Sequence, residues 1–185
     1  MSSLTENPDF VKVGCISTSQ GRIMERLWAP WRREYILGTR KTKGCIFCQK
    51  AKENKDEKNY VLFRGKDCLV MLNLFPYNNG HLMVAPYRHV KSVENLTEGE
   101  AKEMMKILCQ MASLLKEVLH PEGFNVGMNL GKVAGAGVVD HVHLHIVPRW
   151  KGDSHFMSVL SDTRVISEAL KETYNQLKAK LPRVR

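Results

Sequence analysis

Three histidines stand at alternate positions in one short stretch of the chain, "DHVHLHIVPRW", which covers residues 140–150. They are His141, His143 and His145, and hydrophobic residues separate them. Alternate side chains of a β-strand point to the same face, so the spacing predicts a strand with the imidazoles in one row and core residues behind them. Three of the chain's seven histidines fall at this period, which argues against a surface strand with incidental histidines.

A single metal ion held by all three histidines does not fit this geometry. At ~3.3 Å per residue, the Cα atoms of His141 and His145 lie roughly 13 Å apart, too far for both imidazoles to reach one zinc ion at ~2 Å. At most two neighbouring histidines could share a metal. At least one histidine therefore has another task.

The histidine row suits phosphoryl or nucleotidyl transfer. Neutral imidazole is a nucleophile near pH 7, and protonated imidazole binds phosphate oxygens. The central residue, His143, would attack phosphorus while its neighbour and backbone N–H groups bind the non-bridging oxygens. The segment "GKVAGAG" (131–137), with Gly135 and Gly137, could offer such N–H groups because glycine lets the backbone approach a phosphate closely.

A second group of reactive residues is the pair Cys45 and Cys48 in "CIFC". By itself a Cys-x-x-Cys pair is a redox site, half of a zinc site, or a coincidence. The strand-to-helix pattern of a thioredoxin-like redox site is absent, and no second Cys-x-x-Cys or His-x₃₋₅-His follows. The residues alone leave these alternatives open.

Composition bounds the class of protein. The 185 residues are 43% hydrophobic and 25% charged, and no run approaches the ~18 apolar residues of a membrane span, so we expect a soluble protein without a membrane partner. Five cysteines, an odd number without a secretion signal, argue against a disulfide framework and favour the cytoplasm. The net charge of +9 favours anionic partners such as nucleotides or nucleic acids, or reflects a solvated surface.

Residues 1–23 carry little hydrophobic periodicity and are expected to form a flexible leader before a single domain at 24–185 that ends in a helical extension. Apolar runs at 60–63, 68–73 and 82–86 predict three consecutive antiparallel strands, and 124–130 and the histidine stretch add two more.

Two helices complete the predicted fold. Thr97 and Glu100 match a capping box at the start of a helix that runs through residue 119, and 163–181 is amphipathic. Cys68 and Cys109 lie on apolar runs and are expected in the core. The elements predict an α+β domain with an antiparallel sheet of about five strands, a long central helix and a C-terminal helix.

The stretch "HVHLHIV" resembles the His-φ-His-φ-His-φ-φ signature, where φ is hydrophobic, of the histidine triad (HIT) family of nucleotide hydrolases and transferases. The similarity extends to "MLNLFPYNNGHLMVAPYRHV", "NVGMNLGKVAGAGVVDHVHLHIVPRW" and "GDSHFMSVLSDTRV" and covers roughly residues 24–170. These segments look like the branch that contains fragile-histidine-triad-type dinucleoside polyphosphate hydrolases and diadenosine tetraphosphate phosphorylases. The resemblance implies a HIT-like fold and a homodimer whose two sheets join into one.

The resemblance also implies roles for the histidines. His143 would be the nucleophile that forms a covalent nucleotidyl-histidine intermediate. His145 would contact the same phosphate, and His141 would orient the site. His81 matches a recurrent family histidine with a structural role.

Other positions would bind the nucleotide or a metal. Asn73 matches a ribose contact, Phe75 with Leu72 and Leu74 would wall the base pocket or lie in the core, and Asn129 would face the phosphate. HIT proteins with this cysteine pair bind a structural zinc ion with two further histidines, and the matching set here is Cys45, Cys48, His89 and His141.

Two features favour the phosphorylase branch of the family over the hydrolase branch. Hydrolases of the fragile-histidine-triad type carry glutamine where this chain has Gly137, and "PRWKGDSHFM" is similar to the phosphorylase branch. His155 and Met157 would then lie close to the substrate. We therefore expect an enzyme that cleaves dinucleoside polyphosphates such as diadenosine tetraphosphate, as phosphorylase or hydrolase. A nucleoside phosphoramidase is the alternative enzyme. A non-catalytic nucleotide- or nucleic-acid-binding module ranks lower, because a sensor needs no nucleophile within the row.

Overall fold

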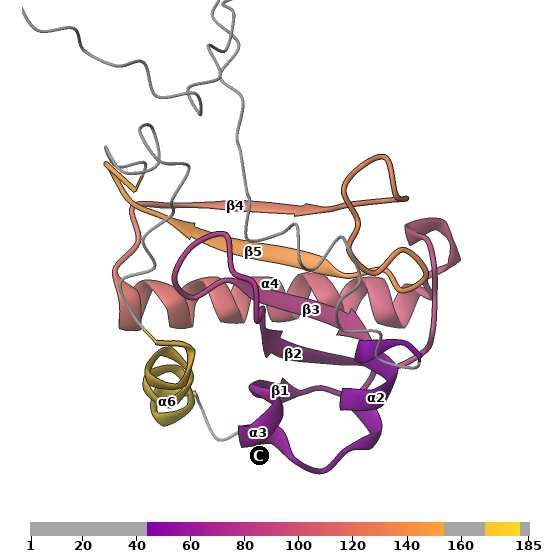
Figure 1. The fold of residues 1–185 in the computed structure, drawn as a ribbon, viewed down its shortest axis with the longest axis horizontal. Helices are drawn as coiled ribbons and strands as arrows, with labels where there is room; N and C mark the ends of the chain where they lie inside the picture. Colours follow the sequence, from indigo (N-terminus) through magenta and orange to yellow (C-terminus); the bar gives the residue numbers. More distant parts are fainter. Residues whose placement is uncertain (1–43, 154–168, 182–185) are drawn as a thin grey trace, which may run out of the picture.

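The computed structural model describes residues 44–153 and 169–181, and the predicted leader at 1–23 lies outside them. A five-stranded antiparallel sheet with strand order β1-β2-β3-β5-β4 forms the centre of the described part (Figure 1). The strands are β1 (Val61–Arg64), β2 (Cys68–Leu72), β3 (Leu82–Pro86), β4 (Gly123–Met128) and β5 (Leu144–Arg149). The helical elements are α2 (Ile46–Lys52), α3 (Asp56–Asn59), η1 (Val93–Asn95), α4 (Glu98–Leu119) and α6 (Leu170–Lys180). The predicted α+β class and the five strands are confirmed.

The long helix α4 begins as the sequence predicts. The Thr97 side chain accepts from the Glu100 N–H at 3.2 Å, and the Glu100 carboxylate accepts from the Thr97 N–H at 2.8 Å. The capping box is confirmed. Cys109 is wrongly placed by the prediction, because it lies exposed on α4. It comes two residues after the buried Ile107, and a helix of about 3.6 residues per turn rotates it to the outer side.

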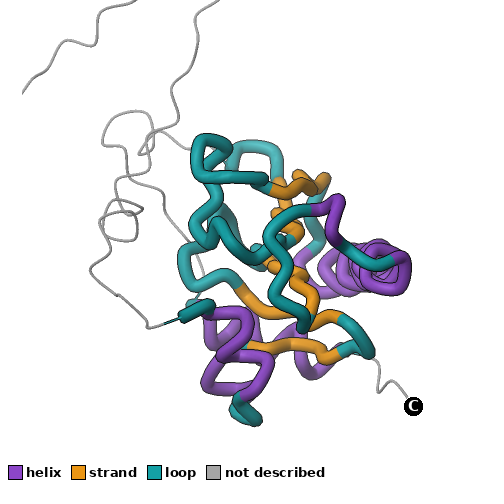
Figure 2. Tube along the Cα trace, turned by 90° about the vertical axis from the view of Figure 1, so that its right-hand side faces the viewer, coloured by secondary structure: helices purple, strands orange, loops and turns teal. Residues whose placement is uncertain are grey.

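The sheet has an apolar cluster on each face. Alternate residues of β2 and β3 pack on α4 and α6 in one cluster, and the residues between them pack with Phe47 of α2 in the other. Figure 2 shows α4 on one side of the sheet and loops gathered on the opposite side. Cys68 lies in the core, as predicted, within the cluster on the α4 side. Burial together with the carboxylates of Glu103 and Glu100 raises the pKa of its thiol to about 12. The face opposite α4 is therefore the one available for a site.

The histidine stretch is only partly a strand, which corrects the prediction. β5 begins at Leu144, so it includes His145 but not His141 or His143. The β3–β5 ladder stops at the pair Val84 and Leu144. Two residues further along β3, Pro86 has no N–H, and its carbonyl accepts from His141 Nε2 at 2.9 Å. A side chain thus replaces the next rung of the ladder.

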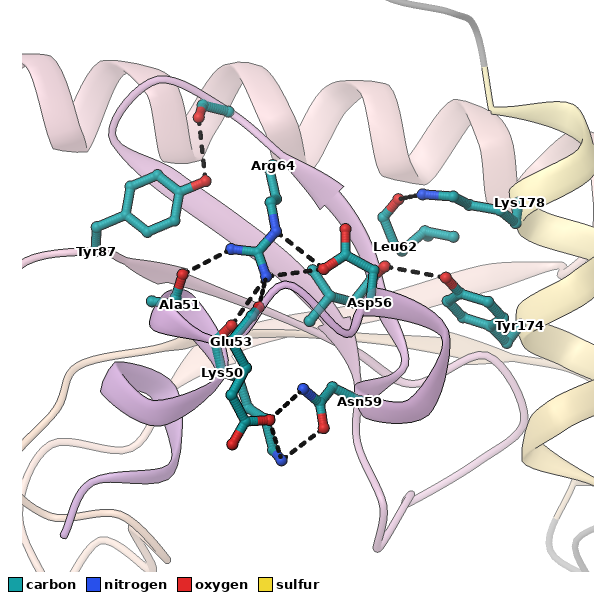
Figure 3. Close-up of polar contacts among 12 residues, drawn as sticks. Lys50, Ala51, Glu53, Asp56, Asn59, Leu62, Arg64, Tyr87, Tyr174 and Lys178 are labelled. Atoms are coloured by element: carbon teal, nitrogen blue, oxygen red, sulfur yellow. Dashed lines mark hydrogen bonds and ion pairs between the residues drawn. The ribbon is translucent and has the colours of Figure 1, made fainter.

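The C-terminal helix closes the β1 edge of the sheet. The Tyr174 hydroxyl donates to the Val61 carbonyl at 3.2 Å, and Lys178 Nζ donates to the Leu62 carbonyl at 2.8 Å (Figure 3). The first residues of the predicted helix, 163–168, lie outside the described residues, and α6 begins at Leu170. Within the described segments, none of the helices combines the length and the apolar character needed to cross a bilayer.

Arg64, at the end of β1, holds the short helix α2 against the sheet (Figure 3). Its guanidinium donates to the carbonyls of Ala51 at 2.9 Å, Lys50 at 2.9 Å and Glu53 at 2.8 Å. The same group contacts the Asp56 carboxylate at 2.8 Å. The last turn of a helix leaves its carbonyls without intrahelical partners, and Arg64 supplies those partners.

We expect Arg64→Met to lower the free energy of unfolding by roughly 2 kcal/mol or more, because it leaves three carbonyls and one carboxylate without this donor. Lys178→Met is the matched control, since Lys178 donates to a single carbonyl, and it should cost less than about 1 kcal/mol. Urea unfolding of both variants measures the difference. Equal losses would contradict the role assigned to Arg64.

Candidate active site and metal centre

His143 is buried and held in one tautomer. Only 4% of its surface is exposed, and its Nδ1 lies 2.8 Å from the His141 carbonyl oxygen. A carbonyl can only accept, so Nδ1 carries the proton and Nε2 keeps its lone pair. Burial lowers the pKa of His143 below its usual value, although the hydrogen bond to His141 opposes that shift. His143 therefore has the neutral form and the lone pair that a nucleophile needs.

His145 is oriented by a chain of hydrogen bonds that begins at the backbone. The Tyr77 N–H donates to His81 Nδ1 at 3.0 Å, and His81 Nε2 lies 2.9 Å from His145 Nδ1. Because His81 Nδ1 accepts, its proton is on Nε2 and is donated to His145. His145 then carries its own proton on Nε2. His81 itself is fully buried.

A pocket on this face brings the predicted residues together. Its lining includes His143 and His145 and five further positions predicted to bind substrate: Asn73, Phe75, Asn129, Gly135 and Gly137. Leu74 also lines it, whereas Leu72 is buried in the cluster on the α4 side. His155 and Met157 lie outside the described residues.

The pocket also contains residues that sequence reasoning missed: Ile46, Phe47, Met71, Tyr77, Met83 and Val138. Strand register could have predicted Met83 as a pocket residue, because Met83 pairs with His145 and its side chain lies on the same face of the sheet. Met71 pairs with Met83 in turn. No local pattern marks Ile46 and Phe47, because their place depends on how α2 packs.

The glycine-rich loop uses two of its amides internally. The Gly135 N–H donates to the Lys132 carbonyl at 3.1 Å, and the Ala136 N–H donates to the Gly131 carbonyl at 3.3 Å. Gly135 has φ +87°, a conformation that glycine adopts easily. The loop borders the pocket, but the amide of Gly135 is committed to the loop's own turn.

Asn73 follows β2 and begins the turn that leads to Phe75. Its Oδ1 accepts from the Phe75 N–H at 3.0 Å, and its Nδ2 lies 3.4 Å from His81 Nδ1. Phe75 lines the pocket and is 37% exposed.

The four predicted metal ligands form one cluster. The ligand atoms of Cys45, Cys48, His89 and His141 all lie within 4.8 Å of one another. Cys45 Sγ lies 3.2 Å from His141 Nδ1, and Cys48 Sγ lies 3.3 Å from His89 Nδ1 and 3.6 Å from His141 Nδ1. Neighbouring ligands of a tetrahedral zinc ion are roughly 3.3–3.8 Å apart, and these three distances are close to that range.

His141 is suited to bind a metal. Its Nε2 donates to the Pro86 carbonyl at 2.9 Å, which leaves the Nδ1 lone pair facing the two thiols. Burial lowers the pKa of His141 and so favours the neutral form that coordinates metal. Two sulfur and two nitrogen donors are a set that zinc prefers.

Comparison with known proteins identifies the family. The HIT domain model matches residues 54–152. An AP-4-A phosphorylase of Mycobacterium tuberculosis is 39% identical over 158 residues, 81% of this chain and 80% of that protein. A zinc-bound histidine triad family protein from Mycobacterium smegmatis is 27% identical, with a TM-score of 0.61 over 75% of this chain and 93% of its own. A HIT family protein from Bacillus subtilis is 30% identical, with a TM-score of 0.54 over 61% of this chain and 79% of its own. With the domain model matching more than half of its residues, the chain belongs to the HIT family.

Proposed function

We propose that this protein cleaves dinucleoside polyphosphates such as diadenosine tetraphosphate through a covalent nucleotidyl-His143 intermediate. Membership of the HIT family and the phosphorylase relative support a nucleotide-processing enzyme. The observation that carries the proposal is the hydrogen bond from His143 Nδ1 to the His141 carbonyl, which leaves Nε2 as the reactive atom of a residue that lines the pocket.

In the first step, the Nε2 lone pair of His143 attacks a phosphorus atom. An N–P bond forms, the bond from that phosphorus to its bridging oxygen breaks, and the leaving nucleotide keeps the electron pair. The imidazole becomes positively charged, and the His141 carbonyl stabilises that charge through the proton on Nδ1. In the second step, water or inorganic phosphate displaces His143 and restores its lone pair.

His145 binds the phosphate oxygens in this proposal. The bond from His81 leaves the proton of His145 on Nε2, where it can be donated to an oxygen that gains charge in the transition state. Asn73 and Phe75 hold the nucleoside, Asn129 faces the phosphate, and Gly137 lies beside it where the loop borders the pocket.

We favour inorganic phosphate over water as the second nucleophile. The glycine at 137 stands where the fragile-histidine-triad-type hydrolases carry glutamine, and the relative that is 39% identical is named a phosphorylase. The resulting products would be one nucleoside diphosphate and one nucleoside triphosphate from a tetraphosphate.

Zinc is the proposed occupant of the cluster formed by Cys45, Cys48, His89 and His141. The donor types and their spacing support zinc, as does the zinc-bound family neighbour. A bound zinc ion would supply structure and no reacting group, because it would join α2 to the segment that precedes β5. The side chain of His141 would bind the metal, while the backbone carbonyl of His141 accepts the hydrogen bond from His143 Nδ1.

The proposed assembly is a homodimer that pairs across β4. This strand lies at the end of the strand order, and within the described residues β5 is its partner. Three consecutive residues of β4, Asn125, Val126 and Gly127, are exposed, and Val126 is 46% exposed. An unprotected edge offers unpaired N–H and C=O groups to a second copy of the chain.

Product analysis tests the reaction. With diadenosine tetraphosphate, we expect ADP and ATP only when phosphate is present, and His143→Ala should lower the rate by about 10⁴-fold or more. His120→Asn is the matched control, since His120 is an exposed histidine in the left-handed region, where asparagine is tolerated. AMP and ATP formed without phosphate would make the enzyme a hydrolase. Full activity of His143→Ala would overturn the nucleophile, and no turnover would favour a phosphoramidase or a binding module.

Two substitutions of His81 test its two hydrogen bonds individually: the one it accepts from the Tyr77 N–H and the one it donates to His145. In His81→Asn, the amide oxygen can still accept from Tyr77, but no donor reaches His145; in His81→Gln, the amide nitrogen can still donate to His145. We expect kcat to fall about 10- to 100-fold in the asparagine variant and less in the glutamine variant. Steady-state kinetics measure this, and equal losses in both would contradict the role of the donated proton.

Sedimentation equilibrium of the full chain tests the assembly. We expect a mass twice that of one chain, and Val126→Lys should shift the equilibrium toward the monomer because it places a charge on the pairing edge. Val133→Lys is a control on a fully exposed loop residue and should leave the dimer intact. A wild-type protein that sediments as a monomer at every concentration would contradict the dimer.

A further inference from the structure

We propose that the segment Cys45–Cys48 couples the metal centre to the nucleotide pocket, so that zinc and a nucleotide each raise the affinity of the protein for the other. Phe47 is the positioning residue of this coupling. The inference rests on the proposed function, because that function makes a nucleotide the ligand of the pocket.

Consecutive residues of the segment serve two different sites. Cys45 and Cys48 supply sulfur donors to the metal cluster. Ile46 and Phe47, which stand between them, line the pocket together with His143 and His145. A shift in the two thiols therefore also shifts part of the pocket wall.

Phe47 contacts histidines of both sites. Its ring centroid lies 5.2 Å from that of His141 and 4.9 Å from that of His143. Phe47 is fully buried and belongs to the apolar cluster opposite α4. Because close-packed side chains cannot move independently, the position of this ring depends on the metal ligand and on the nucleophile at once.

His141 provides a second connection. Its Nδ1 faces the thiols, while its backbone carbonyl accepts the proton of His143 Nδ1. A change in the position of His141 that follows metal binding therefore changes the hydrogen bond that orients the nucleophile.

The two ends of α2 are held by different means. At the C-terminal end, Arg64 bonds the carbonyls of Lys50, Ala51 and Glu53 (Figure 3). At the N-terminal end, the cap residue Cys45 forms no side-chain capping bond, and its thiol faces His141 instead. A metal ion would fix this end, and with it Ile46 and Phe47. A nucleotide packed against Ile46, which is only partly buried, would hold the segment, and with it Phe47 and the thiols, in the position that binds metal.

Two binding measurements on the full chain test the coupling. We would titrate AMP by calorimetry into zinc-loaded and chelator-treated protein, and measure zinc affinity by competition with a chromophoric chelator with and without saturating AMP. Circular dichroism and thermal melting establish whether the metal-free chain is folded. We expect zinc to raise the affinity for AMP about fivefold or more, and AMP to raise the affinity for zinc by the same factor. The two factors, each called a coupling ratio, must be equal because coupling between two binding sites is reciprocal.

Phe47→Leu and Met83→Leu form a matched pair of variants. Both residues line the pocket and belong to the same apolar cluster, but Met83 lies on β3, away from the cysteine segment. We expect the coupling ratio to fall toward one in Phe47→Leu and to stay near the wild-type value in Met83→Leu. If zinc acted only by folding the whole chain, both variants would keep the same ratio, and Phe47 would lose its assigned role.

The failures of the two proposals are distinguishable. Equal AMP affinity with and without zinc, in a folded metal-free protein, overturns the coupling and leaves the proposed function intact. Zinc-loaded protein that does not bind AMP overturns the nucleotide function and the coupling with it. A chain that binds no zinc overturns the metal centre.

Discussion

The hydrogen bond from His141 Nε2 to the Pro86 carbonyl is the interaction on which the site depends. It occupies the place of the next rung of the β3–β5 ladder, so the chain before Leu144 is released from strand geometry. It also turns Nδ1 of His141 toward Cys45 and Cys48 and leaves the His141 carbonyl to accept from His143. One bond thereby orients a metal ligand and the nucleophile. Because Pro86 has no N–H, it cannot donate the bond that a regular ladder pair would need at this position.

The two faces of the sheet have different neighbours, and the pocket lies on only one of them. Strands β2 and β3 are buried on both faces, and their residues alternate between two apolar clusters. The long helix α4 and the helix α6 cover one face, while α2 and the loops cover the other (Figure 2). His145 of β5 pairs with Met83 of β3 and shares its face. A rigid sheet backed by a long helix provides the fixed support that a nucleophile and its phosphate-binding partner require.

Burial and hydrogen bonding act together on the histidines. His81, His141 and His143 are almost completely buried, and burying a polar group without a partner is costly. Each has such a partner: Tyr77 N–H for His81, the Pro86 carbonyl for His141 and the His141 carbonyl for His143. These partners also select the tautomers. Burial keeps His141 and His143 neutral by lowering the pKa of each, and the hydrogen bonds determine which nitrogen carries the proton.

Much of this protein could be predicted from local sequence patterns. Alternating hydrophobic residues and the Thr97–Glu100 capping box determine the strands and α4, because such patterns act through neighbours in the chain. The resemblance of the histidine and cysteine motifs to those of the HIT family identified the set Cys45, Cys48, His89 and His141, which the structure brings together.

Other features depend on contacts between distant segments. The start of β5 at Leu144 follows from Pro86, the commitment of the Gly135 amide follows from the turn of its loop, and the exposure of Cys109 follows from which side of α4 meets the sheet. The place of Ile46 and Phe47 in the pocket follows from the packing of α2, whose C-terminal end is bound by Arg64 at the end of β1. Only the tertiary structure decided these, because the partner that positions each residue is not adjacent to it in the sequence.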